Sequence, residues 1–138
     1  MNSAVTIDAS VFVSAFTPTE PAHQASKTLM LNVRQQSIPI LVPVLVLPEI
    51  SAALSRGQGK PELGLAFVQE MRNLANMTFI DVDDVVATLA VDIAANYCLR
   101  GSDAIYAAVA LRFGTELITL DKEQLDRLPK VLTVRKPE

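Results

Sequence analysis

Short runs of β-branched residues alternate with helix-patterned segments along this chain, and the alternation is the strongest constraint on its fold. The runs that we expect to form strands are residues 4–8, 38–42, 77–82, 117–120 and 131–134. Between them, apolar residues recur at the three- and four-residue spacing of amphipathic helices. Strands that alternate with helices pair in parallel through right-handed crossovers. The pattern predicts an α/β fold: a three-layer α/β/α sandwich with a mostly parallel central sheet.

Size and composition agree with such a fold. The 138 residues are 50% hydrophobic and 20% charged, which suits a parallel sheet whose strands are apolar on both faces. A chain of this length is sufficient for one domain with its own core, so we expect residues 1–138 to form a single domain. The high apolar content also indicates an exposed apolar surface, and therefore a dimer or a bound partner.

Composition disfavours several classes of function. The formal net charge of −3 gives no broad basic footprint for nucleic acid. His23 is the only histidine, which excludes a histidine-rich metal site and disfavours His-based nucleophilic catalysis. Cys98 is the only cysteine, and we expect it to be a buried small hydrophobe. No signal peptide is recognisable, and the longest apolar run, residues 40–47, is too short to span a bilayer. We therefore expect a cytoplasmic protein with no membrane association.

The most informative stretch is residues 99–110, in which small alanines stand between larger apolar residues. Ser102 is a good N-cap for a helix that Gly114 would end. Asp103 would then lie in the first helical turn, facing the positive end of the helix dipole. The alanines would let this helix pack closely against a sheet, with one carboxylate held rigidly at its tip. A lone first-turn aspartate more often only complements the dipole, so the other acids decide between the two interpretations.

Three more acids are expected at the same edge of the sheet as Asp103. Asp8 ends the first expected strand, Asp121 stands at the end of the fourth, and Glu49 lies near the start of the helix after the second strand. Ligands of open parallel sheets bind at this edge, beyond the carboxyl ends of the strands. Each acid also has a purely structural interpretation as a helix cap or a dipole partner. Asp121 with Gln124, for example, matches a capping box.

Converging carboxylates indicate a divalent cation, because burying several like charges without a counterion is unfavourable. Mg²⁺ or Mn²⁺ would suit, since hard cations prefer oxygen ligands. Ser10 and Thr119 each stand two residues from an acid, where a hydroxyl can hydrogen-bond a carboxylate or a metal-bound water. Without a cysteine nucleophile or a histidine base, the chemistry that fits is metal-assisted hydrolysis of a phosphodiester.

These blocks resemble the PIN-domain ribonucleases, most closely the VapC-like toxins of toxin–antitoxin pairs. The resemblance covers nearly the whole chain, in the order expected for the family. Its four blocks are residues 7–13, 42–54, 100–110 and 117–122.

The resemblance implies a Mg²⁺- or Mn²⁺-dependent RNA endonuclease that is a homodimer and is blocked by a small antitoxin protein. It implies an acidic quartet that acts both in catalysis and as metal ligands: Asp8, Glu49, Asp103 and Asp121. Ser10 and Thr119 match the supporting hydroxyl positions of the family. One block departs from the pattern: Lys122-Glu123-Gln124 stands where relatives often carry a further Asp or Asn followed by an aromatic residue.

Two questions stay open at the level of sequence. Arg100 and Lys122 flank the expected site, and each is a candidate phosphate contact or a solvated surface residue. The chain as a whole is either a toxin ribonuclease or a catalytically inactive PIN-like module that binds a protein or RNA partner. Intact acids in three blocks favour the enzyme, whereas the departure in the fourth block and the high apolar content favour the binding module.

Overall fold

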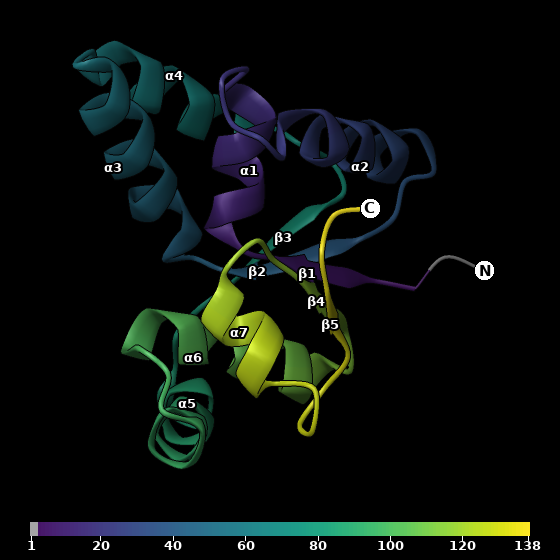
Figure 1. Cartoon of the computed structure of the whole chain (residues 1–138). Helices are drawn as coiled ribbons and strands as arrows, with labels where there is room; N and C mark the ends of the chain where they lie inside the picture. The colour runs from purple at the N-terminus through teal and green to yellow at the C-terminus, as the bar shows by residue number, and fades with distance from the viewer. Residues whose placement is uncertain (1–2) are drawn as a thin grey trace.

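A computed structural model describes residues 3–138 and contains a parallel sheet between two layers of helices (Figure 1). Every pairing in the sheet is parallel, in the strand order β3-β2-β1-β4-β5. The strands are β1 Val5–Ile7, β2 Ile40–Pro43, β3 Met77–Ile80, β4 Glu116–Ile118 and β5 Val134–Arg135. Every residue of β1 and β2 is buried or half-buried, as expected for strands that are covered on both faces, whereas β3 exposes Thr78.

The helices cover both faces of the sheet, with α1 to α4 on one side and α5 to α7 on the other (Figure 1). They are α1 Ala9–Phe16, α2 His23–Gln35, α3 Val46–Gln58, α4 Pro61–Arg72, α5 Asp84–Tyr97, α6 Gly101–Phe113 and α7 Lys122–Arg127. The predicted three-layer α/β/α sandwich is confirmed. Within residues 3–138, no helix has the length and hydrophobicity needed to cross a membrane.

The strand order reverses its direction between β1 and β4, and open parallel sheets have their ligand crevice at the carboxyl ends of two such strands. From β1 the chain adds β2 and then β3 on one side, and afterwards returns to place β4 on the other side of β1. The segments that leave the carboxyl ends of β1 and β4 therefore go to opposite faces and open a gap between them. Asp8 follows β1 directly, and Thr119 follows β4 directly.

Helix α6 is the most deeply buried helix, because its alanines let the backbone approach the sheet. Every residue from Tyr106 to Ala110 is fully buried, and the helix contacts β1, β2 and β4. Gly114 ends the helix in the left-handed conformation, as predicted. The predicted N-cap was wrong: Arg100 caps the helix through its extended backbone, and its carbonyl accepts from the Ala104 amide at 3.0 Å. Ser102 already lies within the first turn.

Two further expectations also differ from the structure. Cys98 is exposed rather than buried, because it ends α5 in a left-handed conformation at the turn into α6. The last strand is shorter than predicted, since the Val131 amide bonds back to the Leu128 carbonyl at 2.8 Å and closes a turn. Only Val134 and Arg135 pair with β4.

Close packing of α4 against α3, the helix that carries Glu49, predicts a specific effect of a methyl group at Gly64. A Cβ there would lie 2.5 Å from Ser55 Oγ and 2.7 Å from the Ser51 carbonyl oxygen. Gly64→Ala is therefore expected to lower the free energy of unfolding by about 1–3 kcal/mol, measured by urea denaturation. Gly57→Ala on α3 is the matched control, because a Cβ at Gly57 meets no atom within 4 Å.

The control variant should gain roughly 0.5–1 kcal/mol from helix propensity. Equal effects of the two substitutions would contradict the tight α3–α4 contact.

Candidate functional site

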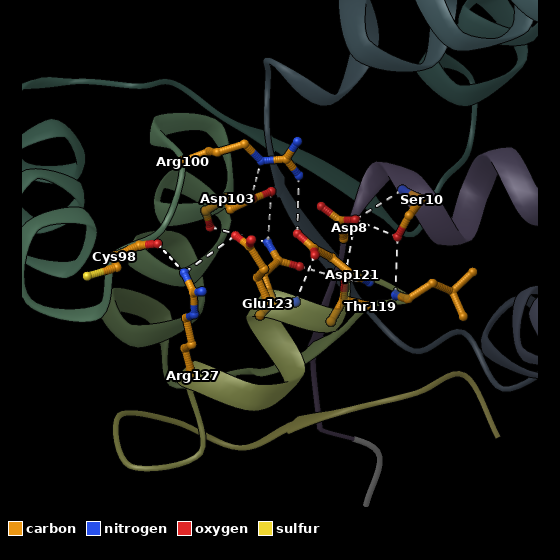
Figure 2. A network of polar contacts seen from close by, with 11 residues as sticks. Asp8, Ser10, Cys98, Arg100, Asp103, Thr119, Asp121, Glu123 and Arg127 are labelled. Carbon is orange, nitrogen blue, oxygen red and sulfur yellow. Dashed lines mark hydrogen bonds and ion pairs between the residues drawn. The ribbon is translucent and has the colours of Figure 1, made fainter.

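The carboxyl ends of β1 and β4 bring acidic and hydroxyl side chains together, as Figure 2 shows. Asp8 is buried at the end of β1, and Asp103 is buried in the first turn of α6. Asp121 is half-buried before α7, and Glu49 is half-buried in the first turn of α3. The four acids expected from the sequence therefore lie at one edge of the sheet.

Asp8 is held by hydrogen bonds to one of its two carboxylate oxygens. Its Oδ2 accepts from the Ser10 amide at 3.1 Å, from the Ser10 hydroxyl at 2.5 Å, and lies 3.3 Å from Thr119 Oγ1. Burial raises the pKa of the Asp8 carboxyl and the charge of Asp121 raises it further, while the hydrogen bonds from Ser10 and Thr119 oppose the shift. No donor among residues 3–138 reaches Asp8 Oδ1, so this oxygen is available to a ligand.

Thr119 and Gln124 connect Asp8 to Asp103. Thr119 Oγ1 accepts from the Asp121 amide at 2.9 Å and lies 2.5 Å from Gln124 Oε1, so its single proton is shared between Gln124 Oε1 and Asp8 Oδ2. Gln124 is fully buried, and its Nε2 donates to the carbonyl oxygen of Asp103 at 3.4 Å and to its Oδ1 at 3.5 Å. The capping-box interpretation of Asp121 and Gln124 is therefore only partly correct. Asp121 does cap α7, accepting from the Glu123 amide at 3.0 Å, but the Gln124 side chain points into the site.

Glu49 is held by Tyr106, a residue that the sequence analysis did not assign to the site. The Tyr106 hydroxyl is buried and donates to Glu49 Oε1 at 2.6 Å. Burial raises the pKa of Glu49, as does the charge of Asp8, whereas Tyr106 and Arg100 oppose the shift. Burial and both carboxylates also raise the pKa of Tyr106, so the phenol stays a proton donor. The sequence does contain a signal for assigning Tyr106 to the site. It stands three residues after Asp103, so the two side chains lie on the same face of the predicted helix.

Arg100 bridges two of the acids from the solvent side (Figure 2). Its Nε donates to Asp103 Oδ2 at 2.9 Å, and its Nη2 lies 3.4 Å from Asp121 Oδ2. Burial raises the pKa of Asp103 to about 6; the charge of Asp121 adds to this shift, and Arg100 opposes it. Lys122, the other candidate phosphate contact, is exposed and takes part in no ion pair within the described residues.

The donor set fits a hard divalent cation, because it consists of carboxylates, and burial raises the pKa of three of them, Asp8, Glu49 and Asp103. Asp8 Oδ1 and Glu49 Oε2 accept no hydrogen bond from residues 3–138. The set is not preassembled, however: in this part of the chain, no three acidic, histidine or cysteine side chains converge closely enough to hold a metal ion. Side-chain rotation at the site would be needed to bring the carboxylates onto one ion.

Comparison with known proteins identifies the family and the fold. The PIN domain family is matched over residues 5–131. A DNA-bound VapBC complex from Salmonella typhimurium has a similar structure, with a TM-score of 0.72, 17% identity and 100% of both chains covered. VapC20 from Mycobacterium tuberculosis, described as a Sarcin-Ricin loop cleaving toxin, gives a TM-score of 0.71 at 18% identity, covering 86% of this chain and 91% of that one. A toxin–antitoxin complex from Klebsiella pneumoniae gives 0.69 at 16% identity, covering 98% of both chains. A search of curated protein sequences finds no match.

The raised pKa of Asp103 predicts how stability depends on pH. The folded-state pKa of about 6 lies above the ordinary value of 3.8, so the folded protein binds more protons between these pH values. This contribution to stability is complete below about pH 4 and is lost as the pH rises through about 6. Between pH 5 and pH 7, the wild type should lose about 1 kcal/mol of unfolding free energy relative to Asp103→Asn, in metal-free urea denaturation.

Asp92→Asn, at an exposed position in α5, is the control and should follow the wild type across the same range. Parallel curves for the wild type and Asp103→Asn would contradict the shifted pKa.

Proposed function

This chain belongs to the PIN domain family, and from that premise we propose that it is a metal-dependent endoribonuclease, the toxin of a type II toxin–antitoxin pair. The observation that carries the proposal is the group of four carboxylates at the crevice between β1 and β4. Three of them, Asp8, Glu49 and Asp103, have raised pKa values because of burial and mutual repulsion. A site that only capped helices would not gain from such crowding.

The metal, Mg²⁺ or Mn²⁺, would be held by Asp8, Glu49, Asp103 and Asp121 after rotation of their side chains. When bound, it would lower the pKa of a water to make the nucleophile and would stabilise the leaving oxygen of a phosphodiester. No carboxylate acts as a covalent nucleophile in this proposal.

The remaining polar groups orient the acids. Ser10 and Thr119 fix one oxygen of Asp8 and leave the other free. Tyr106 does the same for Glu49, and Gln124 holds Asp103 from the α7 side. Each of these donors is itself buried or half-buried in the fold, so together they set where the carboxylates lie in the metal-free protein.

RNA as the substrate and a small antitoxin as the partner are supported by the resemblance to VapC-like toxins and by structural neighbours described as toxin–antitoxin complexes. An apolar groove of about 230 Å³ between α1, α2 and α4 supports a protein partner. Phe16 and Leu31 line it with about half of their surfaces exposed. None of the four acids lines this groove, so an antitoxin anchored there would reach the site with another segment.

Oligomeric state and location complete the proposal. Val85, Val91 and Phe113 on α5 and α6 are exposed apolar residues, and their exposure supports the proposal of a homodimer. We propose that residues 1–138 act as one domain and that the protein works in the cytoplasm; both stay predictions.

A second candidate function, an inactive PIN-like module that binds a partner without cutting, is favoured by two observations. The carboxylates are not preassembled around a metal position within residues 3–138. The sequence Lys122-Glu123-Gln124 also departs from the family pattern, and Asp121 is partly used as a helix cap. Metal binding and RNA cleavage separate the two candidates.

RNA cleavage by the purified protein should require a divalent cation and Asp103. Cleavage of a mixed synthetic RNA panel is expected with Mg²⁺ or Mn²⁺ and not with chelator. Asp103→Asn and Asp8→Asn should each lower the rate by roughly 10²-fold or more, because each removes a carboxylate from the metal-holding set. Asp92→Asn on α5 should cleave like the wild type.

Absence of cleavage together with absence of thermal stabilisation by Mn²⁺ would favour the binding module. Absence of cleavage with clear stabilisation by Mn²⁺ would instead indicate a metal site with a narrow RNA target.

The groove predicts which surface the antitoxin uses. Leu31→Glu places a charge in the groove, and should weaken inhibition by the proposed antitoxin by at least about tenfold. Leu111→Glu, which makes the same change at an exposed leucine of α6 outside the groove, should leave inhibition unchanged. The measurement is the concentration of antitoxin that halves RNA cleavage. Equal loss in both variants would place the partner elsewhere.

A further inference from the structure

Arg100 supplies the one guanidinium or ammonium group, among residues 3–138, that pairs with any of the four carboxylates. We propose that Arg100 is a built-in competitor of the metal, which neutralises Asp103 and Asp121 in the metal-free protein and must leave them before both can ligate a divalent cation. The inference rests on the proposed metal-dependent function and adds a device that regulates the same site.

In both Asp103 and Asp121, one carboxylate oxygen is already hydrogen-bonded within the fold, so only the other oxygen is open to a cation. Asp103 Oδ1 faces Gln124 Nε2, and Asp121 Oδ1 accepts from the Glu123 amide. Both of these oxygens are therefore turned toward α7. The two Oδ2 atoms remain, and Arg100 contacts both, at 2.9 Å and 3.4 Å. Figure 2 shows the guanidinium lying over the pair. A cation shared by these Oδ2 atoms would have to take its place.

The exchange requires the Arg100 side chain to leave the two aspartates, and Arg100 is the exposed partner of both ion pairs. The Arg100 side chain is 73% exposed, whereas those of Asp103 and Asp121 are 8% and 16% exposed. The Arg100 backbone is fixed as the N-cap of α6 by the bond from Ala104. The side chain can therefore rotate into solvent without moving the helix, and an exposed ion pair is weak enough to break.

The unassembled state of the carboxylates agrees with this role. With a guanidinium bridging Asp103 and Asp121, these two aspartates are directed to Arg100 rather than to a position shared with Asp8 or Glu49. This explains why the acids gather at one edge although no three of them converge on a metal position in the described chain.

Competition has opposite consequences for metal binding and for cleavage. By linkage, the stabilisation that Arg100 gives to the metal-free site is subtracted from the affinity for metal. Once released, the guanidinium stands at the rim of the site as a planar fork of donors that matches an RNA phosphate. Removal of Arg100 should therefore strengthen metal binding and weaken cleavage at saturating metal.

The test is calorimetric titration of the full chain with Mn²⁺ alone, for the wild type, Arg100→Gln and Arg112→Gln. Arg100→Gln should bind Mn²⁺ roughly three- to tenfold more tightly, as expected for the loss of two exposed ion pairs. Arg112→Gln removes an equivalent charge at the far end of α6, where Arg112 pairs with Asp83 at 3.2 Å, and should leave the affinity unchanged. Metal-free Arg100→Gln should melt below the wild type, and saturating Mn²⁺ should remove the difference.

The outcomes separate this inference from the proposed function. If the wild type binds Mn²⁺ and cleaves RNA but Arg100→Gln binds Mn²⁺ equally or more weakly, the competition is overturned and the nuclease stands. If the wild type binds no Mn²⁺, both the metal-dependent function and the competition fall. Arg100→Lys, which keeps the charge but loses the planar fork whose Nε and Nη2 contact the two aspartates, should have an affinity between those of the wild type and Arg100→Gln.

Discussion

The hydrogen-bond chain from Asp8 through Thr119 and Gln124 to Asp103 is the interaction on which the rest of the site depends. It links the ends of β1 and β4 to the first turn of α6, three elements that the chain brings together only at the crevice. All four residues are buried, where an unpaired polar group is unfavourable, so each must keep its partner. This requirement fixes the direction of the carboxylates more firmly than packing alone would.

Repulsion between the carboxylates is the second constraint, and it opposes the hydrogen bonds that hold them together. The hydrogen bonds hold acidic groups close together in a partly desolvated crevice, and burial with mutual repulsion raises the pKa values of Asp8, Glu49 and Asp103. Within the described chain, only Arg100 offsets this repulsion through direct ion pairs, and it does so from an exposed position. The site therefore combines hydrogen-bonded acids with a single exposed counterion, as the proposed exchange of Arg100 for a metal ion requires.

Helix α6 makes this combination compatible with a stable fold. Its alanines allow the helix to be buried against the sheet, and the same helix carries Asp103 at its tip and Tyr106 one turn later. Tyr106 reaches across to Glu49 on α3 and so connects the helical layers on the two faces of the sheet. The apolar groove that we propose for a partner lies apart from this site, since none of the four acids lines it.

The sequence by itself determined the alternation of strands and helices, the parallel sheet, and the placement of four acids at strand ends and helix starts. These features depend on patterns within a few residues of each other, and the topology rules convert them into one shared edge. Only the tertiary structure decided which groups meet there. Tyr106 bonds to Glu49, 57 positions away in the sequence, and the Gln124 side chain points into the site instead of capping α7. Arg100 pairs with both Asp103 and Asp121. It also exposed Cys98, because a turn between two helices was needed at that point. Such pairings depend on how the crossovers orient distant elements, which no local pattern specifies.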